Sequence, residues 1–402
     1  MIDRDLAREK WEQAQRLLDQ LDLDAWLIVV RETSVQTDPV LALLGGFDVV
    51  WESYFLLRRD GERVAIVGRY DALPIEGTGL FQRIIPYDED LAPALREVLA
   101  AWNPATIALD YSPDNVVADG LSHGLWLALQ QHLRDTPFPE RFVPADPLVS
   151  RLRAVKTSGE RVRLEAAVRT AERFWAELRA WLRPGLTERA IWEWTQAWLD
   201  ERGLGCAWPC DLMPTVHAGP VPVGHTTAGD AVWEPGSVLH VDFGLVQDGF
   251  CTDQQRIFYA LRPDEDHPPI DLLDVVGAVV GAIEAAAVAL RAGVAGWEVD
   301  QVARSWLVDL AGYPEFKHAL GHTVGRAVHD GGVLLGPRWP RYGTLPLQTV
   351  EPDEVFTLEL GVATPYGYIG IEEEAVVTAA GARFLSPPQT ELIVVAGSRE
   401  QG

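Results

Sequence analysis

The chain is poor in basic residues and in cysteine, and both shortages limit what it can do. Its 402 residues include 34 Lys and Arg against 59 Asp and Glu, so the formal net charge is -25. Nucleic acids are bound through basic surfaces, so we expect no nucleic-acid partner. None of the three cysteines forms a CxxC pair. That argues against a disulfide framework and a thiolate zinc site, and favours a reducing, cytoplasmic location.

Long hydrophobic runs and several common enzyme motifs are also missing. The most apolar stretch, 272–290, is interrupted by Asp274 and Glu284, so we expect no membrane span and no membrane partner. The charged N-terminus does not resemble a signal peptide. There is no GxxxxGK(S/T), no GxGxxG after a strand and no HExxH. The segment GHTVG (321–325) imitates the serine-hydrolase motif GxSxG with Thr at its centre, so it does not support that class.

The first 150 residues alternate strand-like and helix-like runs, which predicts an α/β domain. The strands are expected at 24–30, at 106–112 and in a hairpin over 54–68 that turns at Asp60-Gly61. A helix is expected over 121–133, and a long helical stretch over roughly 158–183 follows two prolines. We therefore predict two domains, residues 1–155 and 156–402.

The second domain contains a candidate internal repeat. LRPGLTERAIWEWTQAWL (182–199) aligns without gaps to LRAGVAGWEVDQVARSWL (290–307). Two interpretations stay open: a chance likeness of two helix starts, or a duplicated unit with a site between its halves.

A predicted hairpin carries two acids in its hydrophobic flanks. VLHVDFGLVQDGFCTDQQRIF (238–258) reads as two strands around a two-residue turn at Asp248-Gly249. Counting back from this turn pairs Gly244 with Asp253 and Asp242 with Gln255. Because strand side chains alternate, Asp242 and Asp253 are expected on one face as diagonal neighbours. They could converge on a cation or be ordinary polar residues of a solvated face.

The rest of the chain favours a cation. FKHALGHTVGRAVHDGG (316–332) concentrates three histidines, and two strand-like runs, VFTLELGV and YIGIEEEAVVT, carry acids in apolar surroundings. A carboxylate without compensation in a core costs several kcal/mol. A shared cation explains several such acids together, and carboxylate-rich sites suit Mn, Mg, Fe or Co. The expected ligands are Asp242, Asp253, His322, Glu359 and Glu372, a set suited to two metal ions with bridging carboxylates.

The same segments carry a family resemblance. DFGLVQDGFCTD, HALGHTVGRAVHD, FTLELG and GIEEEAVVT resemble the metal-ligand motifs of the pita-bread metallopeptidases, and the likeness extends over roughly 150–395. This family includes methionine aminopeptidase, aminopeptidase P and Xaa-Pro dipeptidase (prolidase). A preceding domain of this size fits the Xaa-Pro branch. The resemblance implies an α/β creatinase-like N-terminal domain, followed by a pseudo-symmetric α+β pita-bread catalytic domain.

The resemblance also implies roles for single residues. Asp242 would chelate one metal ion and Asp253 and Glu372 would bridge both, while His322 and Glu359 would complete the other. His225 matches a histidine that contacts the substrate. His318 and His329 match two further active-site histidines. The cofactor would be two divalent ions, manganese in the first place, with Co, Zn, Fe or Mg as alternatives.

Three positions depart from the family pattern. Leu360 stands where Pro is usual after the first glutamate, Gly370 replaces an Arg, and Glu373 replaces an Asp. None of these changes removes a ligand. The arginine lost at position 370 could be compensated by another, for which the candidates are Arg326, Arg338 and Arg341.

The expected activity is metal-dependent hydrolysis of an Xaa-Pro peptide bond. An Xaa-Pro dipeptidase is the first expectation, and aminopeptidase P, acting on longer peptides, is the alternative. Creatine-hydrolysing members act without the metal pair, and binding members of the fold have lost ligands, so a complete ligand set argues against both. The resemblance further implies a homodimer and a proline-containing peptide as substrate.

Overall fold

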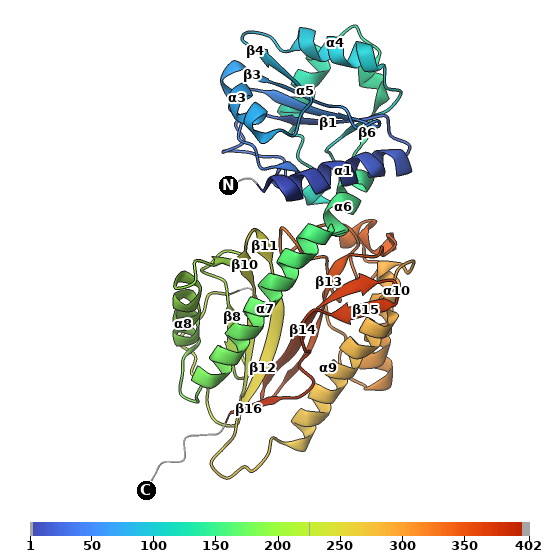
Figure 1. Cartoon of the computed structure of the whole chain (residues 1–402). Coiled ribbons are helices and arrows are strands. Elements are labelled where there is room, and N and C mark those ends of the chain that lie inside the picture. Colours follow the sequence, from blue (N-terminus) through green and yellow to red (C-terminus); the bar gives the residue numbers. More distant parts are fainter. Residues whose placement is uncertain (1–2, 225, 396–402) are drawn as a thin grey trace. The chain divides into compact units, whose positions relative to one another are not determined.

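The computed structural model in Figure 1 describes residues 3–224 and 226–395. The chain divides into two compact units, Met1–Gly159 and Glu160–Gly402. The first unit holds a six-stranded sheet of order β4-β3-β2-β1-β5-β6. Its helices are α1 (Arg4–Gln20), α2 (Leu41–Leu44), α3 (Arg69–Thr78), α4 (Ala92–Trp102), α5 (His123–His132) and α6 (Asp146–Ala154), with short 3-10 turns at Val116–Ala118 and Phe138–Arg141.

The central strand β1 shows that this sheet is covered on both faces, because its alternate residues belong to two different cores. Trp26 and Ile28 of β1 (Ala25–Val30) belong to one core cluster, and Leu27 and Val29 to another. A strand buried on both sides is therefore apolar throughout. The hairpin expected at Asp60-Gly61 is confirmed. The remaining strands are β2 (Ser53–Arg58), β3 (Arg63–Gly68), β4 (Arg83–Tyr87), β5 (Ile107–Leu109) and β6 (Phe142–Pro144).

The second unit is built on a sheet of order β13-β14-β12-β9-β8, with β15 on β14 and β16 on β12. The same unit contains a separate three-stranded sheet of order β11-β10-β7. The strands are β7 (Gly205–Cys206), β8 (Thr215–Ala218), β9 (Val238–Phe243), β10 (Leu245–Gln247), β11 (Phe250–Cys251), β12 (Gln254–Ala260), β13 (Val355–Thr364), β14 (Gly367–Thr378), β15 (Gly381–Phe384) and β16 (Ile393–Val395).

Two long helices lie across one face of the large sheet (Figure 1). They are α7 (Ser158–Trp181) and α9 (Ile270–Ala289), and the shorter helices are α8 (Glu188–Asp200), α10 (Gly296–Arg304), a π-helical turn at Ser305–Leu310 and 3-10 turns at Pro340–Tyr342 and Leu345–Leu347. Val241 and Phe243 of β9 pack in the α7 core, and Leu358 and Leu360 of β13 in the α9 core. Since strand side chains alternate, the residues between them face away from the helices.

The internal repeat corresponds to a structural repeat. Gly185 N–H donates to the carbonyl of Trp233 over 2.8 Å, and Gly293 N–H donates to the carbonyl of Val350 over 2.9 Å. Each segment then forms one antiparallel bridge, enters a helix, and is followed by a hairpin of the large sheet. These equivalent contacts support the duplicated-unit interpretation. The inner strands of the two hairpins, β12 and β14, pair with each other.

Within the described residues, α9 alone has the length and apolar composition of a membrane-crossing helix. Half of that stretch is buried inside the structure. Its buried residues, among them Leu272, Val279 and Ile283, belong to the core cluster that includes residues of β13 and β14. Its hydrophobicity therefore has a role in packing the second unit.

The chain forms one disulfide, although the number and spacing of its cysteines argued against a disulfide framework. Cys206 and Cys210 form a disulfide, with their Cα atoms 5.5 Å apart, while Cys251 is a buried thiol. Two hydrogen bonds hold the second half of this segment: Leu212 N–H donates to the carbonyl of Pro209, and Trp192 Nε1 donates to that of Cys210. Spacing along the chain did not reveal this turn, and the cysteines no longer argue for a reducing compartment.

The packing of α7 on the sheet generates a stability prediction. The rings of Phe174 and Phe243 are stacked with centroids 3.6 Å apart, and both are fully buried. Replacing Phe174 with Ala should destabilise the protein by about 3–5 kcal/mol, because it leaves a cavity. Urea unfolding followed by tryptophan fluorescence measures this. The control Val288→Ala, on an 82% exposed side chain of α9, should change stability by less than about 0.5 kcal/mol; equal effects would contradict the packing account.

Candidate metal centre

Four residues form one row across the centre of the large sheet. The ladder pairs Asp242 of β9 with Gln255 of β12, and Gln255 with Glu372 of β14. Glu372 is paired in turn with Glu359 of β13. Directly paired residues present their side chains on the same face. Three carboxylates and one amide thus lie together on the face opposite α7 and α9, and the predicted pairing of Asp242 with Gln255 is confirmed.

The turn of the first hairpin has the two residues that its sequence predicts. Asp248 and Gly249 both have positive φ, 51° and 77°, as a type I′ turn requires. The strands beside it, β10 and β11, pair Gln247 with Phe250. Asp253 lies directly before β12, two residues from Gln255, so strand alternation directs both toward the same face.

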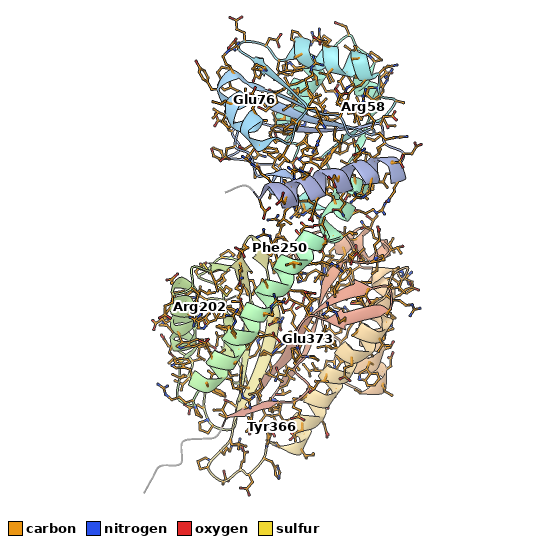
Figure 2. All side chains as sticks on the ribbon, in the orientation of Figure 1. Arg58, Glu76, Arg202, Phe250, Tyr366 and Glu373 are labelled. Atoms are coloured by element: carbon orange, nitrogen blue, oxygen red, sulfur yellow. A yellow bond between two sulfur atoms is a disulfide. The ribbon has the colours of Figure 1, made fainter. Side chains whose placement is uncertain are left out.

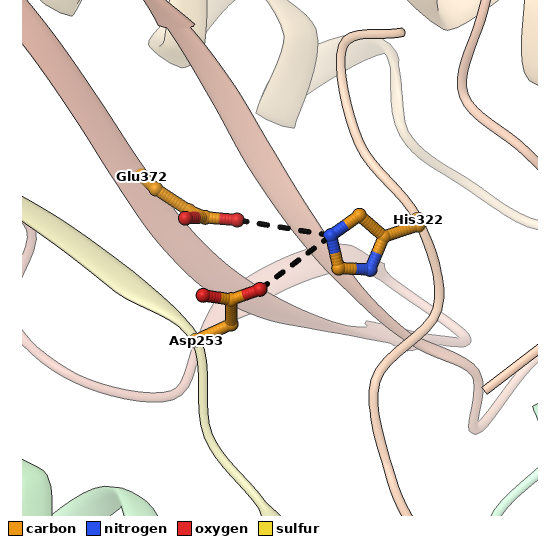
Figure 3. Close-up of side chains that lie close together, drawn as sticks. All are labelled: Asp253, His322 and Glu372. Atoms are coloured by element: carbon orange, nitrogen blue, oxygen red, sulfur yellow. Dashed lines mark ion pairs between the residues drawn. The ribbon is translucent and has the colours of Figure 1, made fainter. Parts of the chain in front are cut away.

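Asp253, Glu372 and His322 converge closely (Figure 3). The Nε2 atom of His322 lies 3.6 Å from Oδ2 of Asp253 and 3.9 Å from Oε1 of Glu372. Oε1 of Glu359 is 4.0 Å from the same nitrogen. One ligand atom from each of the first three residues lies within 4.8 Å of the others. These spacings suit ligand atoms around one cation with bonds of about 2.1 Å.

A glycine allows His322 to reach this face. Its segment runs along β13, where Thr357 N–H donates to the carbonyl of His322 (2.9 Å) and Glu359 N–H to that of Leu320 (2.7 Å). A Cβ atom at Gly321 would lie 1.9 Å from the carbonyl oxygen of Thr357. Any side chain at Gly321 would therefore push the His322 segment away from the carboxylates.

The carboxyl groups of this face oppose one another's ionisation. Burial, followed by the charge of Glu372, raises the pKa values of Asp242 and Asp253 well above their usual range. Burial and then Glu359 do the same to the pKa of Glu372. For Glu359, burial and then Asp242 raise the pKa to about 8. Without a positive charge, this set is therefore partly protonated at neutral pH.

The donor atoms fit a divalent cation. On this face, within the part of the chain that the structure describes, Oδ1 of Asp242, Oε1 of Glu372 and Oε2 of Glu374 are buried oxygens that accept no hydrogen bond. Burial and then His329 lower the pKa of His322 to about 3, so its ring is neutral and keeps a lone pair to donate. Buried acceptors without donors are costly, and a cation would satisfy them. Oxygen donors with one imidazole suit a hard divalent ion.

Three further histidines were predicted to lie in the active site, and the structure shows different surroundings for those that it describes. The rings of His329 and His322 meet edge to face with centroids 4.3 Å apart, so His329 borders the centre. His318 has its Nδ1 atom 2.8 Å from the carbonyl of Ala319, and burial lowers its pKa. His225 lies outside the described residues.

The departures from the family pattern have structural counterparts. A Cβ at Gly370 would lie 2.4 Å from the ring of Tyr368 and 2.8 Å from Nε2 of His240, so these two side chains fill that space. Leu360 is buried in the α9 core. Glu373, labelled in Figure 2, binds Arg256 over 2.9 Å and accepts from the N–H of Gln389.

The three arginines considered as substitutes for the one absent at position 370 contact other parts of the second unit. Arg326 lies 3.9 Å from Glu160 and over the ring of Phe250. Arg338 stacks on Trp297, and Arg341 donates to the carbonyl of Lys317. Their contacts give no reason to choose one of them as the substitute for an arginine at position 370.

Three residues of the site were missed from the sequence: Gln255, His240 and Glu374. Gln255 bonds both glutamate ligands, and His240 bonds Gln255. Glu374 accepts a hydrogen bond from the N–H of Asp253 over 3.3 Å. The predicted register already placed Gln255 opposite Asp242, and alternation along β14 places Glu374 on the face of Glu372. The sequence therefore contained a signal for Gln255 and one for Glu374.

Comparison with known proteins identifies the family. Residues 162–379, more than half of the chain, match the metallopeptidase family M24. The chain belongs to this family. As an M24 metallopeptidase it is a hydrolase of the pita-bread fold, and its family uses divalent metal ions.

Relatives and solved structures agree with this assignment. The chain is 27% identical to an uncharacterized peptidase of Bacillus subtilis (63% of this chain, 68% of the relative). It is 24% identical to an Xaa-Pro dipeptidase of Pyrococcus furiosus (68% and 75%). The structure of an X-Pro aminopeptidase from Thermotoga maritima aligns with a TM-score of 0.70 at 26% identity, covering 96% of this chain and 99% of that one. A dipeptidase structure from Mycobacterium ulcerans aligns at 0.74 and 22% identity (98% and 99%) and is similar in fold.

The crowded carboxyl groups predict how the metal-free protein responds to pH. The pKa of Glu359 is raised from 4.5 to about 8, so its contribution to stability is complete below pH 4.5 and is lost as pH rises toward 8. The melting temperature of chelator-treated protein should therefore fall from about pH 5 to about pH 8. Added Mn²⁺ should raise it most at the upper end.

Calorimetry of two variants tests this origin. Glu359→Gln should flatten the decline, because the amide does not titrate. Glu193→Gln, at an exposed position of α8, should leave it unchanged. A decline that is equally steep in both variants would assign the pH dependence to other groups.

Proposed function

We propose that the protein hydrolyses Xaa-Pro peptide bonds with two divalent metal ions, manganese in the first place, and that it acts mainly as an Xaa-Pro dipeptidase. The observation that carries the proposal is the row of Asp242, Glu372 and Glu359, with His322 and Asp253 converging on it. The complete ligand set argues against a binding role and against the metal-independent members. The named Xaa-Pro dipeptidase relative supports the substrate.

The chemistry follows from the groups on this face. A divalent ion supplies a nucleophile from water near neutral pH and polarises the scissile carbonyl. Glu359 is suited to accept a proton and return it, because its carboxyl group lies in the row of the other ligands on this face. In an Xaa-Pro bond the leaving nitrogen must be protonated before it departs, so Glu359 would deliver that proton. His329 borders the centre from the His322 side, where it can orient the peptide.

Aminopeptidase P activity is the second candidate. The specific observation in its favour is the X-Pro aminopeptidase structure, which aligns over nearly the whole of both chains. The two activities differ in whether a residue is accepted after the proline. They can therefore be separated by peptide length alone.

Hydrolysis of Ala-Pro and Ala-Pro-Ala tests the proposal. Chelator-treated protein should be inactive, and Mn²⁺ should restore cleavage, with Ala-Pro the faster substrate. Release of free alanine measures both reactions. Faster cleavage of Ala-Pro-Ala would assign the aminopeptidase activity instead. A protein that binds metal but cleaves neither peptide would refute the Xaa-Pro substrate.

A matched pair of variants in one hairpin tests the role of the centre. Asp253→Asn should lower kcat/KM by at least about 100-fold, since even residues behind the ligands contribute up to that much. Asp248→Asn makes the same chemical change at the exposed turn, where φ is 51° and Asn is well tolerated. It should keep nearly full activity. Similar losses in both would argue against a specific role for Asp253.

A further inference from the structure

The side chain of Tyr368 belongs to the face of the large sheet that carries the metal centre. Tyr368, Gly370 and Glu372 are alternate residues of β14, so they point to the same side of the sheet. On the neighbouring strand β13, Glu359 is paired with Glu372. The next pair on this face consists of two glycines, Gly361 and Gly370. Beside the two glutamate ligands, the strands themselves therefore leave a space without side chains.

The phenol ring of Tyr368 fills this space. A Cβ atom at Gly370 would overlap Cε1 of the ring, and a Cβ atom at Gly361 would overlap its Cζ and hydroxyl oxygen. The ring of His240 meets it edge to face, with centroids 5.1 Å apart and an angle of 86° between the planes. The ring is thus folded back along the sheet, and its hydroxyl group lies over Gly361, two residues along β13 from Glu359.

The hydroxyl group of Tyr368 is a hydrogen-bond donor that the chain does not use. Within residues 3–224 and 226–395 it makes no hydrogen bond, and the side chain is partly exposed. Burial of the ring, followed by the charges of Glu359 and Asp242, raises the pKa of Tyr368, so the hydroxyl group keeps its proton at neutral pH. A protonated donor beside the centre, without a partner in the chain, is available to a ligand.

The position of this hydroxyl group indicates which part of a peptide it meets. In the proposed function Glu359 delivers a proton to the leaving nitrogen, so the proline of the substrate lies on the Glu359 side of the centre. The Tyr368 hydroxyl group lies on that same side, over Gly361. The proline carries oxygen atoms in its carboxyl group, which is free in a dipeptide and part of a peptide bond in a longer substrate. In both forms these oxygens accept hydrogen bonds.

We propose that Tyr368 is a substrate-binding residue whose hydroxyl group donates a hydrogen bond to the carboxyl group of the substrate's proline. It does so from the space that the family pattern gives to an arginine at position 370, where this chain has Gly370. An uncharged donor thus stands where a cation is usual. The inference rests on the proposed function, because the role of Glu359 places the proline on this side of the centre.

The kinetics of two matched substrates test the inference: Ala-Pro, and Ala-pyrrolidide, whose ring lacks the carboxyl group. In the full-length protein supplied with Mn²⁺, Tyr368→Phe removes the hydroxyl group alone. It should lower kcat/KM for Ala-Pro by about 10- to 100-fold, the range for one hydrogen bond to a charged group. The loss should appear mainly as a higher KM, because the bond forms in the bound peptide and persists in the transition state. The kcat/KM for Ala-pyrrolidide should stay unchanged.

A second tyrosine of the same hairpin provides the matched control. The hydroxyl group of Tyr366, labelled in Figure 2, donates to the carboxylate of Asp271 over 3.1 Å. Tyr366→Phe should leave kcat/KM for both substrates unchanged. An equal loss with both substrates in Tyr368→Phe, or no loss with Ala-Pro, would overturn the inference. Cleavage of neither substrate by the wild type is a separate result, which would refute the proposed function and the inference with it.

Exchanging the two side chains tests the same contact in another way. Tyr368→Gly should lower the ratio of kcat/KM for Ala-Pro to that for Ala-pyrrolidide. Adding Gly370→Arg to this variant should restore part of the ratio, because a guanidinium group in the freed space also donates to a carboxylate. Gly370→Arg alone would overlap Tyr368 and His240, so it should lower the melting temperature instead. A wild-type ratio in Tyr368→Gly would overturn the inference.

Discussion

The electrostatic cost of gathering carboxylates on a buried face constrains the rest of the second unit. Asp253, Glu372 and Glu374 are each almost fully buried, and Asp242 and Glu359 lie beside them in the same row. Such groups ionise together only if a positive charge stands among them. The glycine that admits His322 and the apolar packing of α7 and α9 behind the sheet serve to hold this arrangement in place.

Duplication explains how the chain builds such a row. Each half contributes an outer acid, Asp242 or Glu359, and an inner residue, Gln255 or Glu372. Pairing of β12 with β14 then brings the two inner residues into register. The halves differ at this inner position, where one has an amide and the other a carboxylate. A symmetric framework thus carries an asymmetric set of donors.

The parts of the site that could be predicted are those that break a local pattern. Acids within apolar strands, such as Asp242 and Glu359, are conspicuous, and Asp248-Gly249 sets the register of the hairpin by itself. Gln255 breaks no pattern, and its importance arises from pairing with Glu372, which is distant in the sequence. The disulfide of Cys206 and Cys210 likewise depends on a loop conformation that spacing does not encode.

The order of the strands also affects how the chain is made. The inner edge of the first hairpin, at β12, pairs with β14 through residues 117 positions apart. At ribosomal rates of about 5–20 residues per second, that edge waits on the order of ten seconds for its partner. Throughout this interval the edge of β12 presents unpaired backbone N–H and C=O groups to the solvent. The net charge of -25 opposes pairing of that edge with other copies of the chain during this interval.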